Sequence, residues 1–260
     1  MTTPTARHLD YALSATTGFG AVAGWSGSAL KTSLMVWVGL VAYVALVKVL
    51  FDTFLPEAIA APDQRDAFSW PVISLLGCLG LVGVVLMQRT GFPAALDARV
   101  SNRQRLLVPA LLGLTLGALH ILIEIPTGFA QLNAAAHGVA QQYTGLLPTL
   151  LLFSAAPVLV EPLYRFIPIP VLLCLVSNVI LRGRGQRQVF WALALLTSLL
   201  EPLQQTSVVS GIDPLVFGAV VGRGFALNLV EAVSFRRYGL LAPIVVRETF
   251  YLVWHVLYVH

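Results

Sequence analysis

The chain has 260 residues, of which 16 are Lys or Arg and 12 are Asp or Glu, so 11% are charged. Soluble domains carry about 25% charged residues, whereas here 57% are hydrophobic and the mean hydropathy is +0.82. This composition excludes a soluble globular enzyme, a disordered chain and a nucleic-acid-binding domain. It predicts an all-α, polytopic transmembrane helical bundle, whose Arg and Lys residues report orientation before they report a ligand.

Apolar runs close to the roughly 20 residues that cross a bilayer recur along the chain. They are rich in Leu, Val and Ala and contain Gly and Pro, as transmembrane helices tolerate. The predicted runs are 31–51, 70–88, 106–125, 145–160, 166–181, 188–206, 214–230 and 238–258. They give seven or eight expected spans in three segments, which are an N-terminal cytoplasmic segment (1–30), N-terminal transmembrane helices (31–144) and a transmembrane core (145–258). No apolar region followed by a cleavage site precedes them, so no removed signal peptide is expected.

Basic residues gather in some loops and are scarce in others. The loops 89–105 and 182–187 and the turn at 236–237 are rich in arginine, which predicts that they are cytoplasmic. The loop 52–69 is acidic, and the loop 126–144 has no Asp, Glu, Lys or Arg, so both are predicted to be external. The N-terminus is then cytoplasmic.

This orientation conflicts with the number of apolar runs between Arg105 and Arg182. Both residues are predicted to be cytoplasmic, yet three runs lie between them, and an odd number of crossings cannot join two loops on one side. Either one basic loop breaks the rule, or the stretch 145–181 is not two ordinary spans. Proline removes a backbone donor and favours breaks or kinks, which at membrane depth survive only inside protein or beside a wet cavity. The stretch contains five prolines, at Pro148, Pro157, Pro162, Pro168 and Pro170, so we predict a Pro-broken segment.

Charged residues inside the apolar runs are the candidates for function. A charge near the bilayer centre costs about 2.5–3.5 kcal/mol, so such residues usually pair or face a cavity. Glu161 and Arg165 are spaced i,i+4 and are expected to share a helix face, either as a structural ion pair or as part of a functional site. His120 and Glu124 have the same spacing, but two ligands are too few for a zinc site, which favours a capping or packing role.

Two later runs also carry polar residues at helical spacing. Glu201 and Gln205 lie four apart, and Arg247, Tyr251 and His255 form one polar stripe. If several spans point such residues inward at similar depth, they line an intramembrane cavity. That cavity would suit hydrolysis by held water, or the binding of a polar head or peptide end.

The order of these features resembles the CPBP family of intramembrane proteases, which includes type II CAAX prenyl endopeptidases and lysostaphin-resistance-protein-A-like bacterial membrane proteins. The segment Val160-Glu161-Pro162-Leu163-Tyr164-Arg165 is similar to the family's Glu-Glu-x-x-x-Arg motif. A basic loop follows, and then Glu201 to Gln205 stand at the place of Phe-x-x-x-His. The segment 240–246 resembles the approach to His-x-x-x-Asn/Ser, and Arg247 and Tyr251 stand at those positions. The resemblance covers about 145–258.

The resemblance implies a glutamate-dependent endopeptidase of the bacterial inner membrane, acting on a membrane protein or lipidated peptide without a metal or other cofactor. The four places at which the family has its first Glu, its two His and its Asn or Ser hold Val160, Gln205, Arg247 and Tyr251 here. Valine takes no proton, and glutamine replaces imidazole poorly.

Three interpretations remain open. In a rebuilt site, Glu161 activates water, Arg165 or Arg247 stabilises negative charge, and His255 or Glu201 moves protons. In a catalytically degenerate relative, a pseudoenzyme, the scaffold binds or assembles a membrane partner. A small transporter ranks last, because transporters often show paired broken segments and only one is visible here.

Overall fold

The computed structural model describes residues 26–56, 62–136 and 145–258. In these ranges all regular structure is helical, which confirms the all-α class. The predictions for the N-terminal segment and signal peptide fall largely on residues outside the described ranges, as do Glu57 and residues 137–144 of the loop 126–144.

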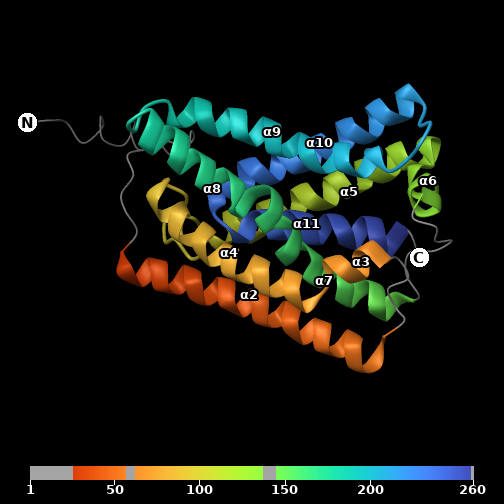
Figure 1. The fold of residues 1–260 in the computed structure, drawn as a ribbon, viewed down its shortest axis with the longest axis horizontal. Helices are drawn as coiled ribbons and strands as arrows, with labels where there is room; N and C mark the ends of the chain where they lie inside the picture. Colours follow the sequence, from red (N-terminus) through yellow and green to blue (C-terminus); the bar gives the residue numbers. More distant parts are fainter. Residues whose placement is uncertain (1–25, 57–61, 137–144, 259–260) are drawn as a thin grey trace, which may run out of the picture.

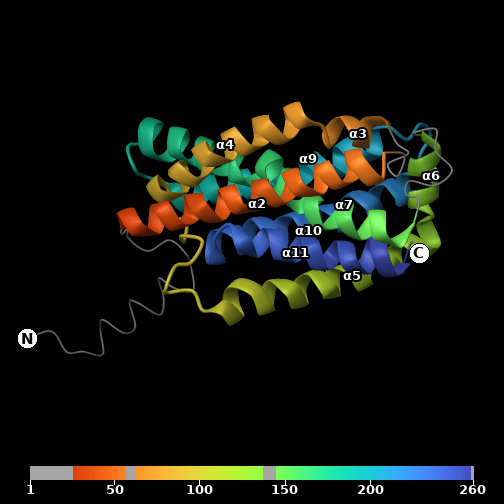
Figure 2. The same cartoon turned by 90° about the horizontal axis from the view of Figure 1, so that it is seen from below.

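In the described part of the chain, seven long helical stretches lie roughly side by side along the long axis of the molecule (Figures 1 and 2). Two short helices, α3 (Pro62–Ala67) and α6 (Phe129–Ala136), lie at one end of the bundle. The long stretches are α2 (Gly27–Phe54), α4 (Trp70–Arg89), η1 with α5 (Arg103–Thr127), α7 to η3 (Leu146–Ile180), α9 (Gln186–Ser207), α10 (Pro214–Tyr238) and α11 with η4 (Leu241–Tyr258).

Five of these stretches are long and apolar enough to cross a membrane, namely α2, α4, η1 with α5, α7 to η3, and α10. This length and composition define a helical membrane protein. The stretches α9 and α11–η4, which carry Glu201 and Arg247, are not among the five. The total of seven or eight spans therefore stays a prediction.

The predicted runs 145–160 and 166–181 form one helical stretch of 35 residues, Leu146–Ile180. Two stretches rather than three now separate Arg105 from Arg182, so both basic loops lie at the same end of the bundle. At about 1.5 Å per residue the stretch is roughly 50 Å long, which exceeds the ~30 Å hydrocarbon core.

Near the prolines this stretch changes from α-helical to the wider π-helical geometry, but it stays helical. After α7 (Leu146–Glu161) comes a π-helical turn, η2 (Pro162–Phe166), in which the Ile167 backbone N–H donates to the Pro162 carbonyl over 3.2 Å. Pro168 and Pro170 then lie in the first turn of α8 (Pro168–Leu173), where a missing N–H costs little. The chain continues through η3 (Cys174–Ile180) as helix. The expected break is therefore a π-helical turn within a continuous helix.

The three basic loops meet at one end of the bundle, which we call the arginine end and which lies on the left in Figure 1. Gln186 Nε2 and Arg236 Nη1 each donate to the Thr90 carbonyl, over 2.8 Å. These bonds join the end of α4 to the first residue of α9 and to the last turn of α10. The clustering agrees with the predicted common side of the basic loops, while the identity of that side stays a prediction.

Glycines allow the closest helix approaches around the bundle interior. A Cβ at Gly83 of α4 would lie 2.4 Å from the Phe166 carbonyl oxygen of η2. A Cβ at Gly113 of α5 would lie 2.1 Å from the Val246 carbonyl oxygen of α11. Gly113 and Gly117 form a small-xxx-small pattern typical of tightly packed membrane helices. These close approaches pack η2 directly against α4 and α11 directly against α5.

Candidate functional site

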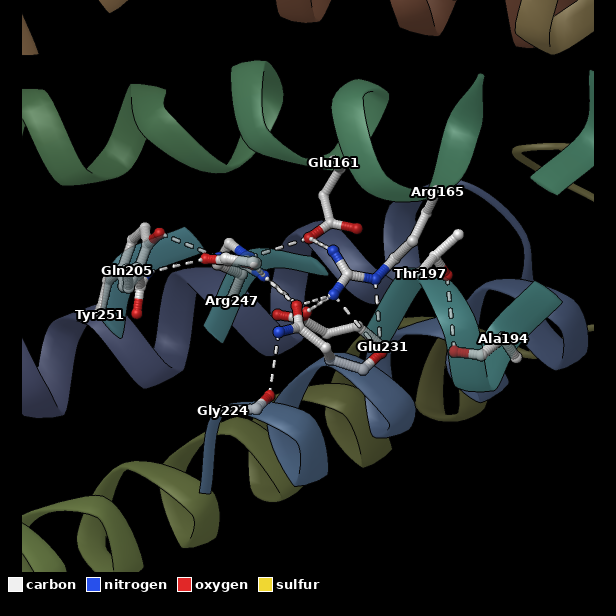
Figure 3. A network of polar contacts seen from close by, with 11 residues as sticks. Glu161, Arg165, Ala194, Thr197, Gln205, Gly224, Glu231, Arg247 and Tyr251 are labelled. Carbon is white, nitrogen blue, oxygen red and sulfur yellow. Dashed lines mark hydrogen bonds and ion pairs between the residues drawn. The ribbon is translucent and has the colours of Figure 1, made fainter. Parts of the chain in front are cut away.

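Charged and amide side chains from four helical stretches converge inside the bundle (Figure 3). Each comes from well inside its stretch, away from both ends of the bundle. Glu161 and Glu231 are fully buried, and the least buried member, Glu201, is 9% exposed. We call this set the ion network, and its members are Glu161, Arg165, Glu201, Asn228, Glu231 and Arg247.

Arg247 of α11 is the centre of the ion network. Its Nη1 and Nη2 donate to the two carboxylate oxygens of Glu201 over 2.7 and 2.8 Å, which is the bidentate geometry of a strong Arg–carboxylate pair. Its remaining donations go to Glu161 Oε1 from Nε (3.0 Å), to the Tyr251 hydroxyl from Nη1 (3.1 Å), and to Asn228 Oδ1 (2.9 Å) and Glu231 Oε2 (2.8 Å) from Nη2. Every nitrogen of this guanidinium is therefore bound by the protein itself.

Arg165 of η2 is the second cation. Its Nη1 donates to Glu161 Oε1 over 3.0 Å, and its Nη2 lies 2.5 Å from Glu231 Oε2 and also bonds Asn228 Oδ1. Glu161 and Glu231 thus each contact both guanidinium groups. The Asn228 amide nitrogen donates to the Gly224 carbonyl over 2.9 Å, which turns the amide oxygen toward the two arginines.

The charges of the ion network do not balance formally. Three carboxylates face two guanidinium groups, so the fully ionised set has one negative charge in excess. Among the described residues, Glu161 Oε2 and Glu231 Oε1 are buried and have no hydrogen-bond partner. Such atoms are costly in a protein interior and often mark a functional or strained site.

Four of the five sequence-predicted site residues belong to this network, namely Glu161, Arg165, Glu201 and Arg247. The i,i+4 spacing of Glu161 and Arg165 gives the expected ion pair. His255 in η4 instead stacks on Phe153, with ring centroids 3.6 Å apart, and lies 5.1 Å from the Tyr251 ring. It adjoins the network through Tyr251.

Sequence reasoning missed Glu231 and the role of Asn228. Glu231 follows the predicted run 214–230 directly, so it resembled a flanking residue. Asn228 and Glu231 are spaced i,i+3 and therefore share a helix face, which was the available signal. In the structure α10 continues to Tyr238 and buries both side chains.

Glu124 belongs to a separate buried ion pair. Its Oε2 lies 2.8 Å from Arg223 Nη2, and its Oε1 accepts a 2.6 Å hydrogen bond from the Ala130 backbone N–H. The His120 ring packs against Trp254, with centroids 4.4 Å apart. Helix packing and loop anchoring account for these contacts. No group of three His, Cys, Asp or Glu residues in the described ranges is arranged to hold a metal ion.

Comparison with family models, with curated proteins and with solved structures finds no match for this chain. The class of the protein therefore comes from its own geometry. It is a helical membrane protein whose interior carries a buried, interconnected ion network.

Proposed function

We propose that the protein binds a membrane protein or lipid-linked peptide without cleaving it, using a helical scaffold that resembles the CPBP intramembrane proteases. The observation that carries this proposal is the saturation of Arg247, whose three nitrogens are all bound by side chains of the chain itself. A group occupied in this way is not free to act on a substrate.

The hydrogen bonds that already engage Glu161 and Arg247 also argue against the roles these residues would have in a rebuilt hydrolytic site. A general base needs an oxygen that can accept a proton from water, but Glu161 Oε1 already accepts from both Arg165 and Arg247. An oxyanion-stabilising group needs N–H donors aimed at the developing charge, and the donors of Arg247 point at glutamates. Val160, at the place of the family's first Glu, supplies no carboxylate.

Polar side chains on α9 and η2 provide a surface for a partner. Gln205 is exposed and donates to Glu201 Oε1 over 3.3 Å, so it connects the ion network to the surface of the bundle. The neighbouring Gln204 is also exposed and accepts a 2.8 Å hydrogen bond from the Tyr164 hydroxyl. Amide side chains on an otherwise apolar surface are suited to hydrogen-bond a polar group of an adjacent membrane segment.

Site-specific photo-crosslinking in native membranes tests this proposal. A crosslinker at Gln205 should capture one membrane partner in stoichiometric amount, whereas one at Leu196 should not. Leu196 is exposed on the same helix, but nine residues away it faces the opposite direction. The capture should disappear in Gln204→Leu. A chain that crosslinks to nothing at Gln205, or equally from both positions, contradicts the proposal.

A glutamate-dependent endopeptidase is the second candidate, because Glu161 Oε2 has no hydrogen-bond partner in the described part of the chain. If Glu161 activates water through this oxygen, Glu161→Gln should abolish cleavage of a co-expressed substrate while the protein level stays unchanged. Unchanged cleavage excludes this candidate.

A further inference from the structure

The C-terminal end of α4 is tied to the turn between η3 and α9. Asn178 Nδ2 donates to the Arg89 carbonyl over 3.2 Å, and Gln186 Nε2 donates to the Thr90 carbonyl over 2.8 Å. These two bonds place Arg89 beside two arginines of that turn and a third in the first turn of α9. We call the four the arginine cluster, and all are exposed at the arginine end: Arg89, Arg182, Arg184 and Arg187.

The turn that presents the cluster has a fixed backbone. Arg182, Gly183 and Gly185 have positive φ angles of 52°, 83° and 66°. The Gly183 N–H donates to the Ser177 carbonyl over 2.7 Å, and the Ser177 hydroxyl donates to the Arg184 carbonyl over 3.1 Å. Arg182 thus holds a left-handed conformation that non-glycine residues rarely adopt. The arginines extend from an ordered base, which reduces the entropy lost when a ligand binds.

The cluster carries four positive charges that stand without a carboxylate partner among the described residues. In the described ranges none of its arginines forms an ion pair with Asp or Glu. The nearby loop holds Asp97, but Arg99 binds both of its oxygens, at 3.0 and 2.7 Å, and lowers the pKa of Asp97. That carboxylate is therefore already engaged.

Helix stability accounts for only part of the arginine cluster. A cation is favourable at a helix C-terminus, which explains Arg89 at the end of α4. Arg182 lies two residues after the end of η3 and is favourable for the same reason, whereas Arg184 shortly precedes α9 and Arg187 lies in its first turn. Positive charge is unfavourable at a helix N-terminus, so Arg184 and Arg187 need another explanation. The predicted cytoplasmic side accounts for their presence in this loop, and an anionic ligand would offset the repulsion among the four arginines.

The cluster also lies at the level where lipid headgroups are expected. The candidate spans Trp70–Arg89 and Leu146–Ile180 both end beside it. Guanidinium groups bind phosphate oxygens through paired N–H donors, and basic groups next to a membrane span bind anionic lipids. We propose that the arginine cluster is a binding site for the phosphate of an anionic phospholipid headgroup. This site is independent of the partner-binding role proposed for α9.

Native mass spectrometry of the full chain, titrated in neutral detergent with phosphatidylglycerol or phosphatidylcholine, tests the proposal. Phosphatidylglycerol should bind preferentially, and R182Q/R184Q should weaken its binding about 25-fold at low salt, at about fivefold per arginine. The matched control R103Q/R237Q removes two exposed arginines outside the cluster at the same end, and should change the affinity less than about threefold. R182K/R184K keeps the charge but loses the paired N–H donors, so its affinity should lie between those of the native chain and R182Q/R184Q.

Several outcomes would overturn the proposal. Equal losses in R182Q/R184Q and R103Q/R237Q would show that bulk charge, rather than the cluster, binds the lipid. Equal binding of the two lipids would show that the headgroup charge is not recognised. Displacement of the lipid by inorganic phosphate at comparable concentration would assign the site to free phosphate. A lysine variant as weak as the glutamine variant, with an unchanged thermal midpoint, would show that charge does not carry the binding.

Discussion

Removing Arg247 tests whether the ion network holds the bundle together. Arg247→Met leaves three carboxylates facing Arg165 alone, so the formal charge of the network changes from −1 to −2. Glu161 and Glu231 keep Arg165 as a partner, whereas Glu201 loses the arginine that binds both of its oxygens. Removing one partner of a buried ion pair costs about 3–5 kcal/mol, because it leaves an uncompensated charge.

The charge count predicts an unusual order of stability. Glu201→Gln reduces the network to two carboxylates and two guanidinium groups, so we expect its stability to stay within about 1 kcal/mol of the native protein. In R247M/E201Q the charge returns to −1, so the double variant should be more stable than Arg247→Met alone. Two individually independent losses would instead add.

Thermal unfolding in mild detergent, followed by tryptophan fluorescence, measures this order. A loss of about 3 kcal/mol corresponds to a midpoint lowered by roughly 10 °C in a chain of this size. Arg237→Met removes an exposed arginine and should change stability by less than about 0.5 kcal/mol. An Arg247→Met protein as stable as the native one, or a double variant less stable than Arg247→Met, would refute the assigned role of the network.

Three further predictions concern packing, topology and pH. Gly113→Leu should strongly reduce the yield of folded protein, because a Cβ there meets the backbone of α11 at 2.1 Å. The control Gly39→Leu should be tolerated, because a Cβ at Gly39 meets nothing within 4 Å. Equal yields of the two variants would contradict the packing. The topology can be tested in a chain whose natural cysteines have been replaced. A cysteine at Ser210 should react with an impermeant maleimide added outside the cell, whereas one at Arg184 should not. The reverse pattern would show that the predicted topology is inverted. Arg99 lowers the pKa of Asp97. The contribution of Asp97 to stability should therefore be present at neutral pH and lost as the pH falls through that lowered pKa. A thermal midpoint that Asp97→Asn leaves unchanged at neutral pH would disprove this contribution.

The sequence predicts the membrane class and the main ion pairs because both depend on local patterns. Apolar runs identify the helices, and the i,i+4 spacing of Glu161 and Arg165 predicts their contact. The high cost of an intramembrane charge also indicates that Glu201 and Arg247 face the interior. Their direct pairing required knowledge of which helices are neighbours.

Other features depended on details that composition does not encode. The runs 145–160 and 166–181 appeared separate because proline disfavours regular α-helix, yet one i→i+5 hydrogen bond at Pro162 continues the helix. Glu231 lay beyond the last apolar residue of its run, and only the burial of α10 against its neighbours places it inside. His255 continued the stripe of Arg247 and Tyr251, but its ring stacks on Phe153.

The pairing of Glu201 with Arg247 has a consequence for how the chain enters a membrane. Each residue belongs to a stretch that is absent from the five apolar enough to cross by composition, and each carries a charge that costs about 2.5–3.5 kcal/mol near the bilayer centre. Neither charge is neutralised within its own helix, because the partner lies 46 residues away along the chain. If both stretches cross the membrane, we expect stable insertion of α9 to depend on the synthesis of α11, so that α9, α10 and α11 integrate together.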